Sequence, residues 1–267
     1  MEKSRRRVRS IFVSDVHLGC RHSKADLLLA FLKRHSCDYL YLVGDIIDGW
    51  KMKRGFRWND TSTLLVRRIF GMVKHGATVR YVAGNHDEFL RNYMEEFQTA
   101  LTGHIEIADE FVHYTADHRR LLVIHGDIFD AVSINMPWLT HLGDRAYSGL
   151  LTANTTANWL RRKLGWKYKS YSLYMKQNVK RAMNYVNSFE EMMAMHTRRR
   201  ECQGVVCGHI HTPAVKQLDE LAYYNCGDWV ESCTALLEHD DGRIELVNFD
   251  DDLANQPALA EAGVCET

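Results

Sequence analysis

Residues 8–19, VRSIFVSDVHLG, join an apolar run to an Asp-x-His pair. The run Val8–Val13 has the length and the β-branched content of a buried strand, and the polar pair follows its end. The same arrangement returns four times, as GDIID at 44–48, GNHD at 84–87, HGD at 125–127 and GHIH at 208–211. Strands that end at one edge of a sheet deliver the loops that follow them to one place. We therefore expect the polar residues of all five motifs to converge.

The five motifs together supply a set of side chains that can bind metal ions. The seven candidate ligands are Asp15, His17, Asp45, Asn85, His125, His209 and His211. Carboxylate, amide and imidazole groups without a thiolate suit Mn²⁺, Zn²⁺ or Fe better than a structural zinc site, and we favour Mn²⁺. The set is too large for one tetrahedral ion and fits two divalent ions that share a bridging carboxylate. Two ions about 3.5–4 Å apart clamp a phosphoryl group, so the sequence predicts hydrolysis of a phosphoester or phosphoanhydride.

An Asp-x-His or His-x-His pair alone is a weak signal, because most isolated histidines are packing or surface residues. The nine histidines outside these ligand positions and GNHD fit no motif and are interpreted as structural. Five motifs in this order, each after a strand-like run, are much harder to attribute to chance.

Strand-like and helix-like patterns alternate in the first half of the chain, which is typical of an α/β fold with parallel strands. After Val8–Val13 we expect a helix at 24–35, a strand at 39–43, a helix at 60–75 capped by Asp60, a strand at 78–83 and a helix at 88–98. Three hairpins are expected further on, at 111–124, 214–225 and 235–248.

Composition is that of an ordinary globular protein, with 46% hydrophobic and 25% charged residues. No apolar run reaches the roughly 18 residues that a transmembrane helix needs. The basic N-terminus runs into the first strand without the apolar core of a signal peptide. Seven scattered cysteines form no C-x-x-C pair, which is typical of a reducing compartment. We therefore expect a cytoplasmic protein.

Residues 131–200, between HGD and GHIH, have helical periodicity and are predicted to form a helical insertion. Positions 145–200 carry 12 Lys and Arg against 2 Glu, so a net charge of zero for the whole chain hides a strongly basic segment. Aromatic residues alternate with these charges. Such a segment suits an anionic membrane surface or a lipid-bearing phosphate, although it could also bind nucleic acid or form a cap with a solvated charged face.

The motif series D-x-H, G-D-x-x-D, G-N-H-D, H-G-D and G-H-x-H resembles that of the calcineurin-like metallophosphoesterases over residues 8–250. The resemblance implies an α/β layered fold of two packed mixed sheets with helices outside both and a cap at 131–200. The tail at 251–267 is acidic, then small and polar, and is expected to be disordered. It further implies that Asp15, His17, Asp45 and His211 hold one metal ion, and that Asp45, Asn85, His125 and His209 hold the other. By the same resemblance His86 lies beside the leaving-group oxygen, as general acid or transition-state stabiliser, and Asp87 orients it.

A narrower resemblance comes from GDIIDGW, the insertion, GHIHTPA and YYNCGDWVES. These features resemble the UDP-2,3-diacylglucosamine pyrophosphohydrolases of lipid A synthesis, in which the insertion receives the acyl chains of the substrate. The resemblance implies cleavage of UDP-2,3-diacylglucosamine or a related glycolipid diphosphate to UMP and an acylated sugar 1-phosphate. The basic aromatic insertion predicts contact with the inner membrane, and no nucleic acid partner is expected. Residues expected to contact the substrate are Trp50, Arg161, Lys167, Tyr168 and Tyr171.

One residue departs from that branch, whose best-known members have Arg where this chain has His86. A phosphodiesterase or phosphatase that acts on a nucleotide or another soluble phosphoester is therefore the alternative activity. A non-catalytic scaffold is disfavoured because every candidate ligand is present. We expect Asp48 and Asp127 to fix loop shape or histidine tautomers. Asn225, Gly227 and Asp228 are expected to form the wall of the pocket.

Overall fold

The computed structural model describes residues 5–53, 55–93, 104–129 and 171–249. The chain divides into two compact units, one of residues 1–126 and 194–267 and the other of residues 127–193. The strands of the described residues all belong to the first unit, where they form two sheets.

The first sheet has six strands in the order β11-β10-β1-β2-β3-β4. Its strands are β1 (Arg6–Val13), β2 (His35–Val43), β3 (Thr78–Val82), β4 (Ile105–Ala108), β10 (Thr234–Glu238) and β11 (Ile244–Asn248). Strands β1 to β4 pair in parallel, whereas β10 pairs antiparallel with both β1 and β11. The carboxyl ends of β1, β2 and β3 therefore lie at one edge, and three of the five motifs follow them.

The second sheet has five strands in the order β5-β6-β7-β9-β8. These strands are β5 (Glu110–Tyr114), β6 (Arg120–Ile124), β7 (Gly204–Cys207), β8 (Ala214–Leu218) and β9 (Leu221–Asn225). Strands β6, β7 and β9 are parallel, and the hairpins β5–β6 and β8–β9 add an antiparallel strand at each side. The HGD and GHIH motifs follow the parallel neighbours β6 and β7.

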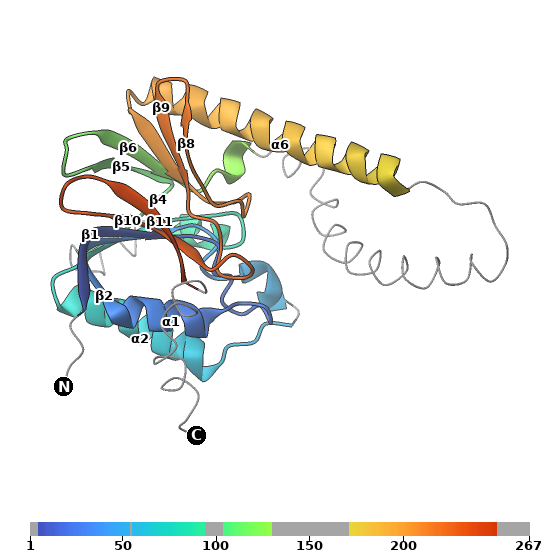
Figure 1. Cartoon of the computed structure of the whole chain (residues 1–267). Coiled ribbons are helices and arrows are strands. Elements are labelled where there is room, and N and C mark those ends of the chain that lie inside the picture. The colour runs from blue at the N-terminus through green and yellow to red at the C-terminus, as the bar shows by residue number, and fades with distance from the viewer. Residues whose placement is uncertain (1–4, 54, 94–103, 130–170, 250–267) are drawn as a thin grey trace, which may run out of the picture. The chain divides into compact units, whose positions relative to one another are not determined.

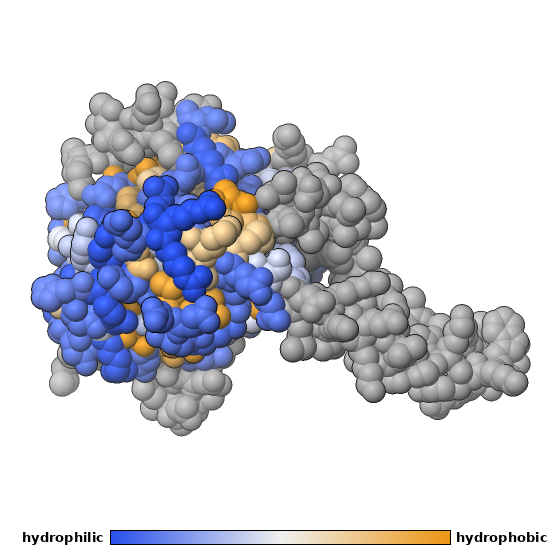
Figure 2. Space-filling model, turned by 90° about the horizontal axis from the view of Figure 1, so that it is seen from above, coloured by the Kyte–Doolittle hydropathy of each residue, from blue (hydrophilic) through white to orange (hydrophobic). Residues whose placement is uncertain are grey.

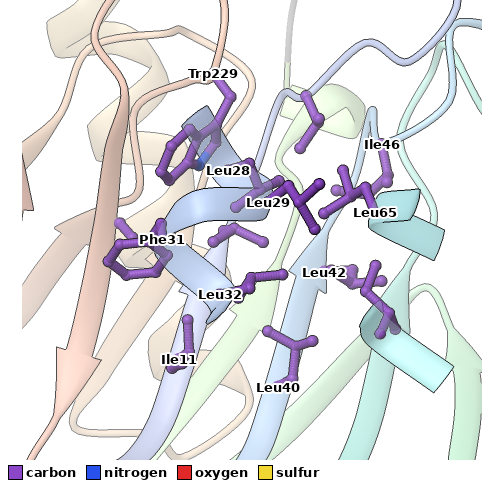
Figure 3. Packing of buried hydrophobic residues seen from close by; sticks show 14 of the residues in the cluster. Ile11, Leu28, Leu29, Phe31, Leu32, Leu40, Leu42, Ile46, Leu65 and Trp229 are labelled. Carbon is purple, nitrogen blue, oxygen red and sulfur yellow. The ribbon is translucent and has the colours of Figure 1, made fainter. Parts of the chain in front are cut away.

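Helices α1 (Ala25–Arg34) and α2 (Asp60–Lys74) cover one face of the first sheet (Figure 1). Leu28 and Leu32 of α1 point toward Ile11 of β1 and Leu40 of β2 (Figure 3). All four side chains are fully or almost fully buried. Alternate residues of a strand face the same side of its sheet, so Ile11 and Leu40 present one apolar face to the helix. The helices thus fix the outer face of the sheet from which the motif loops emerge.

The opposite face of the first sheet packs on the second sheet. Phe12 and Tyr41, which alternate with the helix-facing residues, stack with ring centroids 4.7 Å apart. They share a buried cluster with Val123 of β6 and Val206 of β7. The expected α/β layered fold of two mixed sheets is confirmed.

Three details differ from the expectations. Strand β4 was not predicted, because four residues with the alternating sequence IEIA give a weak pattern. The expected helix at 88–98 is a 3₁₀ helix, η2, over Glu88–Tyr93, and positions 94–98 lie outside the described residues. The cap of α2 is Asn59 rather than Asp60, since its side chain accepts a hydrogen bond from the Ser62 N–H at 2.8 Å.

The remaining described helices are the short η1 (Gly49–Lys53) and η3 (Asp127–Phe129), together with α6 (Tyr171–Arg199). Helix α6 falls within the insertion predicted at 131–200, whereas positions 131–170 and the tail at 251–267 lie outside the described residues. Within the described ranges, no helix combines the length and hydropathy needed to cross a bilayer. The face shown in Figure 2 is mainly hydrophilic in its described part, with apolar residues scattered between polar ones.

The packing of α1 predicts a contrast between two leucine substitutions. Leu32 of α1 is fully buried, whereas Leu64 of α2 is 47% exposed. Leu32→Ala should lower the free energy of unfolding by about 2–5 kcal/mol, and Leu64→Ala by less than about 0.5 kcal/mol. Denaturant titration of both variants measures this contrast. Equal losses would contradict the described packing of α1 on the sheet.

Candidate metal centre

Asp15 stands two residues after β1, and its carboxylate is completely buried. One oxygen, Oδ2, accepts hydrogen bonds from the Ser14 hydroxyl and from the backbone N–H of His209 at 3.0 Å. The other oxygen, Oδ1, lies 3.0 Å from His211 Nε2 and 3.8 Å from His17 Nε2. One oxygen is thus held by the protein, and the other faces two imidazoles.

Asp45, two residues after β2, is arranged in the same way. Its Oδ1 accepts a hydrogen bond of 2.8 Å from the backbone N–H of His86. Its Oδ2 lies 3.4 Å from His125 Nε2, 4.0 Å from His17 Nε2 and 4.0 Å from His86 Nε2. This oxygen therefore lies among histidines from three separate motifs.

Three groups of side chains in the described residues have ligand atoms that lie within 4.8 Å of one another. They are Asp15–His17–His211, Asp45–His125–His209 and His17–Asp45–His86. Asp45 belongs to two of these groups and His17 to two, so the three groups form one continuous cluster. Asn85 adds a buried amide oxygen, Oδ1, that has no hydrogen-bond partner among the described residues. Such an oxygen is costly to bury unless a cation or another donor satisfies it.

Backbone conformation at the cluster is unusual. Asp15, His17, Asp45, His209 and His211 all have positive φ angles, between 50° and 67°. Few residues other than glycine adopt this region, although Asp, Asn and His tolerate it better than most. A positive φ at a non-glycine residue is strained, and such strain is concentrated at functional sites.

Glycine permits the close approach of the motif loops. A Cβ at Gly84 would lie 2.3 Å from Asp45 Oδ1, and one at Gly44 would lie 2.3 Å from the His125 ring. Gly44 also has a φ of +75°. The ring of His125 is oriented by a 2.9 Å contact from its Nδ1 to the carbonyl oxygen of Val43, so its Nε2 is directed at Asp45.

His86 and its two neighbouring aspartates have different surroundings. Nδ1 of His86 lies 3.0 Å from Asp48 Oδ1. Asp87, expected to orient His86, instead accepts hydrogen bonds from the N–H groups of Gly84 (2.6 Å) and Ile46 (2.8 Å) and from the Tyr81 hydroxyl. The carboxylate of Asp87 therefore ties the GNHD loop to the GDIID loop, and Asp48 is the carboxylate that contacts the His86 ring.

Burial and charge act against each other on the pKa values of the cluster. Burial alone would raise the pKa of Asp15, but the charge of His211 and hydrogen bonds from His17 and His211 hold that pKa well below its usual range. Burial acts to lower the pKa of His211, yet the Asp15 carboxylate raises it to about 9. Burial and the nearby Asp45 carboxylate raise the pKa of Asp87. Before metal binds, His211 is thus an imidazolium at neutral pH.

Three residues support the cluster although the sequence did not predict their contacts. Ser14, next to a ligand motif, has its hydroxyl within hydrogen-bond distance of two acceptors, the Asp15 carboxylate and, at 2.6 Å, the Val43 carbonyl oxygen. Asn225, expected in the pocket wall, donates from Nδ2 to the carbonyl oxygen of Gly208 at 2.9 Å. The backbone N–H of Trp229 donates to the Asp15 carbonyl oxygen at 3.0 Å. The YYNCGDW segment therefore braces the loops that carry two motifs.

The other predicted residues lie as follows. Gly227, with φ +71°, donates its N–H to Asn225 Oδ1, and Asp228 Oδ2 lies 3.8 Å from His211 Nδ1. Asp127 begins η3, and Tyr171 begins α6. Arg161, Lys167 and Tyr168, expected to contact substrate, lie outside the described residues. Trp50 stacks on His86, with ring centroids 3.8 Å apart.

Comparison with known proteins agrees with this fold and cluster. Residues 8–213 match the model of the calcineurin-like phosphoesterase family, and the chain belongs to that family. It is a metal-dependent phosphoesterase by that membership. The buried aspartates, the unsatisfied Asn85 oxygen and the four converging imidazoles fit the divalent metal ions of such an enzyme.

The chain is similar to the UDP-2,3-diacylglucosamine hydrolase of Psychromonas ingrahamii, with 24% identity over 83% of this chain and 90% of the relative. It is also similar to the UDP-2,3-diacylglucosamine hydrolase of Shewanella pealeana, with 21% identity over 91% of this chain and 98% of the relative. Among solved structures, an archaeal phosphodiesterase aligns with a TM-score of 0.46 and 11% identity, over 90% of this chain and 98% of that one.

The raised pKa of His211 predicts that metal binding releases protons. At pH 7 the imidazolium must lose its proton before it can bind a cation, whereas Asp15 is already ionised. The affinity for Mn²⁺ should therefore rise with pH until the pH reaches about 9. Calorimetric titration of the metal-free protein with Mn²⁺ in two buffers of different ionisation enthalpy counts the protons. A binding enthalpy that is the same in both buffers would contradict the proposed protonation state of His211.

Proposed function

We propose that the protein is a dinuclear-metal phosphohydrolase that cleaves the diphosphate of UDP-2,3-diacylglucosamine or a related glycolipid to UMP and an acylated sugar 1-phosphate. The observation that carries the dinuclear part is the position of Asp45. Its Oδ2 lies within 4.0 Å of nitrogen atoms from His17, His86 and His125, so one carboxylate reaches both ligand groups. The similar UDP-2,3-diacylglucosamine hydrolases, which align along most of the chain, support the substrate class.

The ligand assignment follows the two outer groups of the cluster. Asp15, His17 and His211 would hold one ion, and His125 and His209 would hold the other with the amide oxygen of Asn85. Asp45 would be shared by the two. Mn²⁺ is the favoured metal, and Zn²⁺ and Fe fit the same oxygen and nitrogen donors. When bound, these ions supply a nucleophile at neutral pH and stabilise charge on the phosphoryl oxygens.

His86 has the geometry of a proton donor to the leaving group. Its Nδ1 faces the Asp48 carboxylate, which accepts a hydrogen bond from it, and its Nε2 is the ring nitrogen nearer to Asp45 Oδ2. Because Nδ1 keeps its proton, the doubly protonated ring is the form that can give the Nε2 proton to the leaving group. The ring side chain is 21% exposed, so the substrate can reach it. Asp87 acts through the loop backbone and not on the imidazole. A histidine at this position can transfer a proton, whereas an arginine could only stabilise charge.

The substrate class also rests on the composition of the insertion. A diphosphate with two acyl chains needs cations for its charge and an apolar cleft for its tails. The sequence between 145 and 200 supplies basic residues for the charge and aromatic residues for contact with the tails. We retain Arg161, Lys167, Tyr168 and Tyr171 as candidate contacts, and an anionic inner-membrane surface on the cytoplasmic side as the place of action.

Hydrolysis of UDP-2,3-diacylglucosamine with added Mn²⁺ tests the proposal. We expect UMP and the acylated sugar phosphate as products. Asp45→Asn should lower kcat by roughly 100-fold or more, because the substitution removes the bridging charge. Asp219→Asn is the matched control, since Asp219 has the same φ of 54° as Asp45 but a side chain that is 83% exposed.

The outcomes separate the two candidate substrate classes. Turnover of the glycolipid that is lost in Asp45→Asn and kept in Asp219→Asn supports the proposal. If the glycolipid is not cleaved while an aryl phosphodiester or a cyclic nucleotide is, the enzyme acts on a soluble phosphoester and the glycolipid assignment fails.

The membrane contact makes a separate prediction. Replacing the Lys and Arg residues between 161 and 169 with Ala should reduce sedimentation with anionic liposomes, because each basic residue near the surface contributes about 1 kcal/mol. Hydrolysis of a soluble aryl phosphodiester should not change. Liposome binding that is unaffected by these substitutions, or absent from the wild type at low salt, would contradict the membrane role.

A further inference from the structure

The last three residues of the segment GDIIDGW, residues 48–50, all contact His86. Asp48 Oδ1 lies 3.0 Å from its Nδ1, and the Gly49 N–H donates to its carbonyl oxygen at 2.9 Å. The indole of Trp50 stacks on the imidazole, with ring centroids 3.8 Å apart and planes inclined by 29°. Residues 48–50 thus hold both the backbone and the ring of His86.

The glycine in the middle is necessary for this approach. A Cβ on Gly49 would lie 2.6 Å from the carbonyl oxygen of His86 and 2.9 Å from the ring of Phe89. No larger residue fits there without displacing one of the two chains. Because Gly49 lies so close to the backbone of His86, the next residue, Trp50, can stack on the imidazole ring.

A single hydrogen bond does not determine the direction of a ring. With Nδ1 bonded to Asp48, the imidazole could still turn about that contact and move Nε2 away from the cluster. The His17 ring meets His86 edge-on, at 4.5 Å and 85°, and limits its movement on that side. The stacked indole restricts the plane of the imidazole. Together these contacts leave Nε2 4.0 Å from Asp45 Oδ2.

We propose that Trp50 is a positioning residue, whose stacked indole holds the His86 ring in the plane from which Nε2 reaches the leaving-group oxygen. This inference rests on the role proposed for His86 but not on the identity of the substrate. It also changes the expectation for Trp50, from a residue that contacts the substrate to one that acts through His86.

A double-substitution cycle tests this role. Trp50→Ala, His86→Ala and the double variant are compared with the wild type, all loaded with Mn²⁺, on aryl and alkyl phosphodiesters of graded leaving-group pKa. Trp50→Ala should lower kcat by roughly 10- to 100-fold on the poorest leaving groups, since misplacement of a general acid has effects of that size. The loss should shrink for good leaving groups, which need no proton.

Two further variants show whether the loss is specific to the stack. Trp50→Phe keeps an aromatic face and should restore most of kcat. Trp58→Ala removes a tryptophan of the same segment that is 44% exposed and bonded to Thr63 rather than to His86, and it should leave kcat unchanged.

The expected cycle is strongly non-additive, so that the double variant is as slow as His86→Ala alone. If Trp50→Ala slows the His86→Ala enzyme by the same factor as the wild type, or raises KM with kcat unchanged, Trp50 acts on substrate or fold and the proposal is overturned. Denaturant midpoints of the four metal-free proteins should also be non-additive, and additive midpoints would contradict the stack. Failure of the glycolipid assay alone would leave these results unaffected.

Discussion

The site depends on two buried carboxylates that are each held by the backbone of a distant motif. The N–H of His209, 194 residues away, donates to Asp15, and the N–H of His86, 41 residues away, donates to Asp45. Burial of a carboxylate is costly unless hydrogen bonds and opposite charges compensate it. In both carboxylates, one oxygen accepts a backbone hydrogen bond that compensates part of the cost of burial, and the second oxygen can bind a cation. The bond from His209 joins a loop of the second sheet to a loop of the first, and the bond from His86 joins two loops of the first sheet.

The loops are also joined to each other along their backbones. The N–H of Asp15 donates to the Gly44 carbonyl oxygen at 3.1 Å, and that of His17 donates to the Asp45 carbonyl oxygen at 2.9 Å. These bonds extend the parallel pairing of β1 and β2 beyond the ends of the strands. They hold Asp15, His17 and Asp45 in left-handed conformations that cost about 1–3 kcal/mol each. Such strained conformations persist because the surrounding hydrogen bonds hold the backbone in place. They direct the side chains of all three residues into the candidate metal cluster.

The parallel strands and hairpins could be predicted from the sequence, because apolar runs with turn residues between them are strong patterns. The convergence of the five motifs could also be predicted, since parallel strands place their following loops at one edge. The different contacts of Asp48 and Asp87 could not be predicted from the sequence. Both aspartates lie within three residues of a candidate ligand, and only the folded loops show that Asp48 meets the His86 ring while Asp87 meets Gly84, Ile46 and Tyr81. Ser14 and Trp229 were missed for a similar reason: their contacts depend on residues far away in the chain.

Spectroscopy of the metal-loaded protein tests the central claim most directly, because it reports on the distance between ions rather than on turnover. Electron paramagnetic resonance of the protein titrated with Mn²⁺ should show an exchange-coupled signal that saturates at two ions per chain, and Asp45→Asn should abolish the coupling. Asp45 Oδ2 lies 4.0 Å from His17 Nε2 and 3.4 Å from His125 Nε2, and the bridge proposed at this carboxylate predicts that result. The signal of isolated Mn²⁺ at every metal ratio, or coupling that persists in Asp45→Asn, would contradict a dinuclear centre bridged by this carboxylate.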